Sequence, residues 1–138
     1  MNGLPASAPP YNPEAAPFWD GAAKGRLVLP VCDACGHHIW YPRSWCPVCA
    51  SESVTWTTLS GQGHVYARTV LHRGMGPWRD AVPFVVAYVE LDEGPRILTN
   101  IVTDEPEQVS VGDRVQAVFV PVEPTDHSPV RAIVRFAP

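Results

Sequence analysis

The sequence predicts a mostly β protein, in which a short N-terminal helix and a small cysteine-containing ribbon precede a five-stranded barrel. Three observations support this fold class. All four cysteines of the 138-residue chain fall in two Cys-x2-Cys pairs within residues 32–49. Five runs rich in Val, Ile, Tyr and Phe follow, each separated from the next by turn residues. The one segment with helix signals is short and lies before the cysteines.

The N-terminal part, residues 1–25, is expected to be a flexible arm followed by a short docking helix. Residues 1–11 are rich in Pro and Ala and contain no apolar period. Pro17 suits a first helical position and Gly25 suits the position just after a helix. A helix this short is marginal alone and must dock on something. Phe18 and Trp19, on one turn, are the candidate contacts with a partner subunit, and docking on the chain's own ribbon is the alternative.

The predicted ribbon domain spans residues 26–60. It contains both cysteine pairs, which have the spacing of metal-binding knuckles. Two such turns brought face to face form a tetrahedral S4 cage for Zn²⁺, and the predicted ligands are Cys32, Cys35, Cys46 and Cys49. Iron in a rubredoxin-like site and two structural disulfides are the alternatives. The chain starts at Met1 without an apolar, cleavable leader, so we expect a reducing, cytoplasmic location, which disfavours disulfides.

The predicted zinc is structural, because four thiolates leave no open coordination position for a substrate or a reactive water. His37 and His38 lie between the pairs and are expected to be loop residues rather than ligands. Ribbon strands are predicted at 27–31, near 39–41 and at 54–59. The predicted ribbon core consists of its leucines and tryptophans, namely Leu27, Leu29, Trp40, Trp45 and Trp56.

Residues 61–138 are expected to form the barrel, with strands at 64–71, 84–91, 96–102, 114–120 and 130–136. The OB-fold is the predicted architecture for five short strands without a long helix, and an SH3-like barrel is the competitor that strand count does not exclude. The longest connection, residues 72–83, borders the usual ligand face of an OB-fold. Arg73, Trp78 and Arg79 are therefore the candidate ligand-side residues; in the alternative, the loop folds Trp78 and Val82 over the barrel mouth.

Composition and motifs argue against nucleic-acid binding, a membrane span and several classes of enzyme. The net charge is −4, and residues 80–138 alone carry −6, whereas a nucleic-acid binder needs a basic stripe. The longest apolar stretch, Ala81–Val89, is about half of what a membrane-spanning helix requires. The sequence contains no nucleophile elbow, phosphate loop or dinucleotide fingerprint. The adjacent acids Asp92 and Glu93 are expected to be solvated, so we expect no catalytic residue in this chain.

Several segments together resemble one family, the zinc-ribbon/OB-fold proteins associated with acyl-CoA enzymes and long classed as a domain of unknown function. The matching segments are Pro17–Gly21, Cys32–Gly36, Cys46–Cys49, Pro83–Asn100 and Val111–Val115. The resemblance covers about residues 14–138.

The resemblance implies an accessory subunit that forms a hetero-oligomer with a thiolase-like or hydratase-like protein and acts on acyl-CoA thioesters. With a lipid-transfer-type thiolase partner, it implies a retro-aldolase that shortens a steroid side chain, with the catalytic residues in the partner and the CoA thioester as substrate of the complex. The alternatives are a nucleic-acid-binding OB-fold module and a rubredoxin-like electron carrier.

Overall fold

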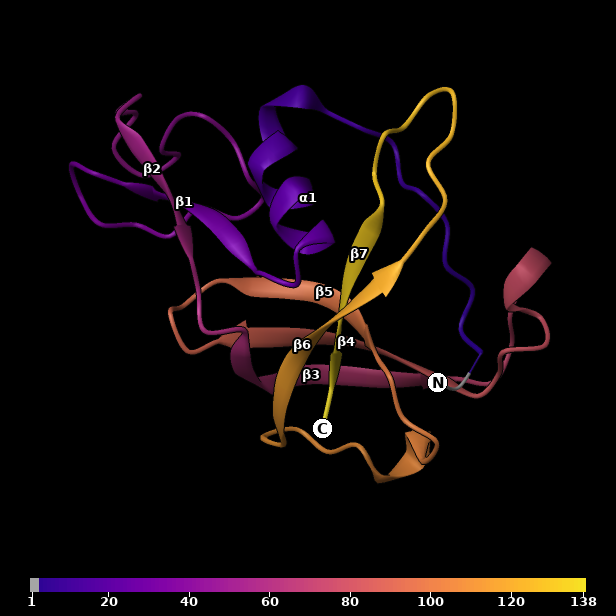
Figure 1. Ribbon diagram of the computed structural model, residues 1–138. Coiled ribbons are helices and arrows are strands. Elements are labelled where there is room, and N and C mark those ends of the chain that lie inside the picture. Colours follow the sequence, from indigo (N-terminus) through magenta and orange to yellow (C-terminus); the bar gives the residue numbers. More distant parts are fainter. Residues whose placement is uncertain (1–2) are drawn as a thin grey trace.

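The computed structural model describes residues 3–138 and has a ribbon and a short helix above a β-barrel (Figure 1). One α-helix, α1, spans Ala16–Ala23, and short 3-10 turns occupy η1 (Pro13–Ala15), η2 (Gly76–Trp78) and η3 (Pro106–Gln108). The strands are β1 (Val28–Cys32), β2 (Val54–Thr58), β3 (Gln62–Leu71), β4 (Phe84–Leu91), β5 (Arg96–Ile101), β6 (Arg114–Pro121) and β7 (Ala132–Ala137). Among residues 3–138, no helix combines the length and apolar character needed to cross a membrane.

The five barrel strands close in the order β3-β4-β5-β7-β6, with β6 pairing back onto β3. All neighbours are antiparallel except β5 and β7, which run parallel and meet at Ile101 and Phe136. Because β7 inserts between β5 and β6, the chain follows the closed five-stranded path of an OB-fold. The strand order therefore identifies an OB-fold, whereas the number of strands alone did not exclude an SH3-like barrel.

One hydrophobic core joins the ribbon to the barrel. Leu27 and Leu29 from the ribbon belong to the same buried cluster as barrel residues such as Val65 and Phe136. Trp40 and Trp56 pack against this cluster while remaining partly exposed. Sharing a core makes the orientation of the ribbon on the barrel a property of the fold.

Two predictions for the ribbon need correction. Trp45 is 44% exposed and is not a core residue, since it lies in the loop before the second knuckle with the Arg43 guanidinium 5.6 Å from its ring centroid. The short strand expected near 39–41 is reduced to a single bridge between Val31 and His38. The space between β1 and the knuckles is instead filled by Ile39, which is fully buried.

Helix α1 packs on the chain itself, between the ribbon and β7 (Figure 1). Phe18 is only 3% exposed, and its ring meets Trp19 and Trp40 edgewise at centroid distances of 4.8 and 5.5 Å. This arrangement leaves Phe18 no surface for a partner, so the predicted partner contact of this side chain is corrected. The alternative, docking of the helix on its own ribbon, is what the structure shows.

The close approach of α1 to β1 depends on Gly21, and replacement of Gly21 by Ala is expected to destabilise the protein. A Cβ there would lie 2.6 Å from Val28 Cγ2 and 3.1 Å from the Arg26 carbonyl oxygen. The overlap costs about 2–3 kcal/mol, against a gain of about 1 kcal/mol in helix propensity, which leaves a net loss of about 1–2 kcal/mol. Urea unfolding of the native protein and of Gly21→Ala measures this loss of stability. Asp20→Ala, at an exposed neighbouring position, is the control and should not lower stability.

The N-terminal arm is packed against the rest of the chain rather than extended into solvent. Residues 3–11 contain no helix or strand, yet the Arg135 guanidinium donates a hydrogen bond to the Pro5 carbonyl. At the end of the arm, Ser44 donates both its N–H and its hydroxyl to the Glu14 carboxylate, at 2.8 and 2.7 Å. The flexibility expected from composition stays a prediction for residues 3–11, which in the structure contact the barrel through Pro5; residues 1 and 2 of that prediction lie outside the described residues.

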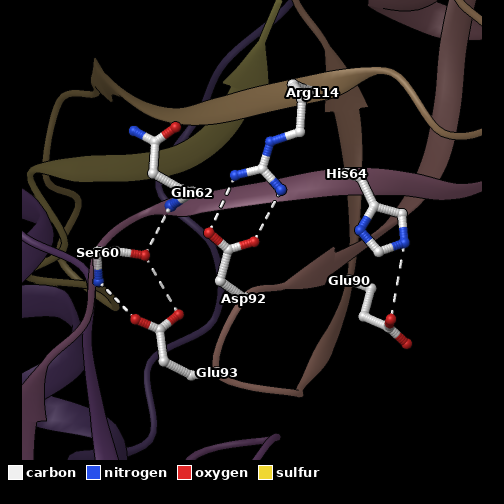
Figure 2. Close-up of polar contacts among 7 residues, drawn as sticks. All are labelled: Ser60, Gln62, His64, Glu90, Asp92, Glu93 and Arg114. Carbon is white, nitrogen blue, oxygen red and sulfur yellow. Dashed lines mark hydrogen bonds and ion pairs between the residues drawn. The ribbon is translucent and has the colours of Figure 1, made fainter.

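Of the two adjacent acids after β4, Glu93 ties the barrel to the segment that enters it from the ribbon, and Asp92 ties the β4–β5 turn to β6 (Figure 2). The Glu93 carboxylate accepts the N–H of Ser60 at 2.8 Å and its hydroxyl at 3.3 Å. Asp92 accepts two hydrogen bonds from the Arg114 guanidinium, at 2.8 and 2.9 Å, and this pairing lowers the pKa of Asp92. The two side chains diverge, as expected, but each has a structural partner rather than only solvent.

Candidate metal centre and contact surfaces

The four cysteines converge on one point. Their Sγ atoms all lie within 4.8 Å of one another, and no other group of three or more His, Cys, Asp or Glu side chains within residues 3–138 is arranged to hold a metal ion. Two pairs of sulfur atoms join the two knuckles closely, with Cys32 Sγ 3.5 Å from Cys49 Sγ and Cys35 Sγ 3.6 Å from Cys46 Sγ. Tetrahedral Zn–S bonds of about 2.3 Å place neighbouring sulfurs about 3.8 Å apart, so the cage fits Zn²⁺.

Two similar tight turns create this cage. In each, a backbone N–H four residues further along donates to the first cysteine's carbonyl: Gly36 to Cys32 at 2.9 Å, and Ala50 to Cys46 at 2.8 Å. The residue after the second cysteine has a positive φ in both turns, 76° at Gly36 and 65° at Ala50. The left-handed residue reverses the chain immediately behind the sulfur, which points both thiols of a turn toward the same side.

Hydrogen bonds hold the first knuckle against β2 and favour its thiolate. Asp33 accepts from the hydroxyls of Ser53 and Thr55 at 2.8 and 2.7 Å, and these bonds, Thr55 first, lower the pKa of Asp33. The Cys35 N–H approaches Cys32 Sγ at 3.4 Å, and this contact is the largest of several causes that together lower the pKa of Cys32 to about 7, whereas burial and the Cys46 thiol raise the pKa of Cys35. A thiolate is the form that binds metal.

The site has two buried ligands, Cys32 and Cys46, and two exposed ones, Cys35 and Cys49. None of the four forms a disulfide. With four sulfur ligands the metal would have no open position, so its contribution is to fold the ribbon rather than to activate a substrate. His37 and His38 lie outside this sulfur cluster, as the sequence indicates.

Trp19 is the member of the aromatic pair that keeps exposed surface. It is half-buried and lines a depression of about 190 Å³ together with Tyr11 and Asp20 on one side and Val130 and Arg131 on the other. A partner side chain can reach Trp19 there without moving the helix. The prediction of a partner contact therefore survives for Trp19 alone, as a proposal.

The connection 72–83 folds partly over the barrel, as one of the two alternatives required. The Trp78 ring packs on Phe84, with ring centroids 4.7 Å apart, and Val82 is half-buried. Arg73 and Arg79 are exposed on the same connection. A ligand would therefore meet the two arginines directly but would meet only one side of Trp78.

Two exposed apolar surfaces are not evident from the sequence. On the outer barrel face, Tyr66, Tyr88 and Leu98 are 44%, 46% and 57% exposed, beside a shallow depression of about 210 Å³. Tyr88 and Leu98 are register partners on β4 and β5, and the β3 irregularity between Val65 and Ala67 contains Tyr66. A second surface, on the ribbon, contains Tyr41 and Trp45. Alternation of side chains along a strand normally indicates which residues face outward. The irregularity in β3 interrupts this alternation at Tyr66, so the sequence does not reveal the exposed face.

Arg135 is the other residue that the sequence analysis did not single out. It is 5% exposed although it lies in β7 between apolar residues, where the run Ala132–Phe136 contains this one charge. The guanidinium carbon is 5.8 Å from the centroid of the Trp78 ring. A lone cation in an apolar strand was the available signal.

Comparison with known proteins agrees with this architecture. The family model described as the ChsH2 rubredoxin-like zinc ribbon domain matches residues 19–55, and the model described as the ChsH2 C-terminal OB-fold domain matches residues 56–120. The chain belongs to the DUF35 (ChsH2) family. In this family's terms, the cysteine cage is that of the zinc ribbon, which supports structural zinc.

Among similar DUF35 family members, a DUF35 domain-containing scaffold protein of Methanocaldococcus jannaschii is 38% identical over 67% of each chain. A probable enoyl-CoA hydratase alpha subunit of Thermomonospora curvata is 34% identical over 88% of this chain but only 38% of its own length. The 3-oxo-4,17-pregnadiene-20-carboxyl-CoA hydratase alpha subunit of Mycobacterium tuberculosis is 33% identical over 81% of this chain and 35% of its own length.

A solved structure titled Ltp2-ChsH2(DUF35) aldolase contains a chain that resembles this DUF35 protein along nearly all of its length. The TM-score is 0.77 at 32% identity, and the similarity covers 94% of this chain and 98% of that one. The hydratase alpha subunits, in contrast, are more than twice as long as the region they share with this chain.

Proposed function

We propose that this chain is a structural-zinc accessory subunit that assembles with a thiolase-like partner into an acyl-CoA carbon–carbon bond enzyme. The reaction we propose is retro-aldol cleavage of a steroid side-chain CoA thioester. The observation that supports it most is the near end-to-end similarity to the chain of the aldolase structure. A relative named for the CoA thioester of a pregnadiene carboxylate points to steroid substrates.

The surface of the chain suits assembly better than catalysis. Tyrosines, tryptophans and arginines are enriched in protein interfaces, and Trp45 with Arg43 and Tyr66 with Arg96 are such pairs at the surface. The metal site, filled by sulfur, offers no Lewis-acid position. In the proposed complex, the partner supplies the residues that deprotonate the β-hydroxyl and stabilise the carbanion left on the acyl-CoA fragment.

The proposal is tested by affinity purification of the tagged chain from its own cells, followed by mass spectrometry of stoichiometric partners. The complex is then assayed with a steroid that carries a β-hydroxyacyl-CoA side chain. We expect a thiolase-like partner, cleavage to a steroid ketone and a shorter acyl-CoA by the complex, and at least a hundredfold lower rate for either subunit alone. A hydratase-like partner that only adds or removes water would contradict the aldolase assignment, and recovery of nucleic acid instead would favour the binding-module alternative.

A further inference from the structure

Arg135 is a buried cation without a counter-ion among residues 3–138. Its Nη1 is inaccessible to solvent and has no hydrogen-bond partner there. Nη2 donates to the neutral carbonyl of Pro5, and no carboxylate of the part of the chain that the structure describes lies within ion-pair distance. Burial lowers the pKa of Arg135, because the buried guanidinium has lost water and no counter-ion among the described residues replaces it.

Such a group normally carries a penalty, because desolvation of a guanidinium is repaid only when an anion or several acceptors replace the lost water. Asp92 pairs with Arg114, and Glu90 pairs with Arg96. These two acids are therefore engaged by other arginines and do not neutralise Arg135. The planar N–H groups of a guanidinium match the two oxygens of a carboxylate or phosphate group. The unused Nη1 thus points to an oxyanion as the missing partner.

Two groups that contact the Arg135 guanidinium belong to segments outside the barrel strands. One is Pro5, in an arm without helix or strand; the other is Trp78, in the connection 72–83. In Figure 1 the indigo arm runs past β7 toward the end of the barrel where β3 leads into η2. Displacing the arm would free Arg135 from the Pro5 carbonyl without breaking any strand pairing, because residues 3–11 belong to no sheet.

We propose that Arg135 is an oxyanion-binding residue whose site is closed by the N-terminal arm, and that a carboxylate or phosphate group replaces the Pro5 carbonyl when it binds. The inference does not depend on the proposed enzyme complex, because it concerns the isolated chain and small anions. The exposed Arg73 and Arg79 lie on the connection that also carries Trp78, so further positive charge is present on this part of the surface.

The test follows the side-chain Nε–Hε signal of Arg135 by NMR in the zinc-loaded, full-length protein. Inorganic phosphate and acetate are titrated separately, with sodium chloride holding ionic strength constant. We expect a saturable shift of the Arg135 signal and only a chloride-like response from the exposed Arg131. Saturation with phosphate alone would assign a phosphorylated ligand, and saturation with acetate alone would assign a protein carboxylate. The absence of saturation with both anions would overturn the proposal.

Two variants separate binding from a structural role. Arg135→Met should keep or raise the melting temperature, because it removes an unpaired buried charge, and should abolish the anion-dependent thermal shift seen in the native chain. A marked fall in melting temperature with an unchanged anion response would show that Arg135 is structural. Leu4→Ala, at a half-buried arm position, should tighten anion binding severalfold by loosening the arm, whereas Ser7→Ala, at an exposed position, should not. Equal affinities in the two arm variants would refute the closing role of the arm.

Discussion

Replacement of Cys46 by Ser is expected to abolish stoichiometric zinc binding and to unfold the knuckle region. Cys46 is fully buried, and the separate cluster around the cage contains only Cys32, Ile39 and Cys46, with Val54 at its edge. One isoleucine cannot organise some twenty residues without help. Structural zinc contributes roughly 10–16 kcal/mol in finger-sized peptides, far more than the net stability of an ordinary domain.

The loss should extend into the barrel, because Leu27 and Leu29 belong to the common core. We expect one zinc per native chain by elemental analysis, less than a tenth of that in Cys46→Ser, and a melting transition that is broadened or lost. His38→Ala is the matched control: it alters the same loop and should retain one zinc. A Cys46→Ser protein with full zinc content and an unchanged melting curve would disprove the S4 assignment, and coloured protein with one iron would favour the rubredoxin alternative.

The strands could be predicted because local signals agree with the fold. The runs at residues 84–91 and 96–101 are bounded by turn residues, and Gly94 in the turn between them has the positive φ that such a turn requires. The metal cage was predictable for a similar reason, since the cysteine spacing is itself a local geometric constraint. In both cases the decisive contacts lie within a few residues of one another or have a fixed spacing.

What the sequence did not determine depends on contacts between distant segments. The helix pattern indicates that Phe18 must be buried. Burial against Trp40 and burial against a partner subunit would both satisfy that pattern, so the sequence does not distinguish them. Trp45 is as hydrophobic as Trp40, and only its place in the knuckle loop leaves it exposed. Arg135 becomes unusual only when Pro5 and Trp78 close over it, and these residues are far from it in sequence. Burial of this kind is a tertiary property.

Gly63 is a glycine within a barrel strand, and a single methyl group added there should damage the barrel. It lies at the start of β3, where the strand pairs with Leu91 of β4 on one side and Val115 of β6 on the other. A Cβ here would lie 2.5 Å from the Glu90 carbonyl oxygen and 2.9 Å from Val89 Cγ1. The first of these atoms belongs to the backbone of a paired strand, so it cannot turn away as a side chain would.

Gly63→Ala is therefore expected to lower the free energy of unfolding by about 3 kcal/mol. Zinc content should be unchanged, because the three atoms nearest to the added Cβ all belong to β4 and none to the ribbon. Gly94→Ala provides the comparison, since a Cβ there meets nothing within 4 Å and the cost arises only from a φ of +121°. Conformational strain of this kind costs about 1–2 kcal/mol. Urea unfolding of both variants separates the two causes: a larger loss in Gly63→Ala shows that close approach of β3 to β4 limits the closure of the barrel, whereas equal losses would refute that explanation.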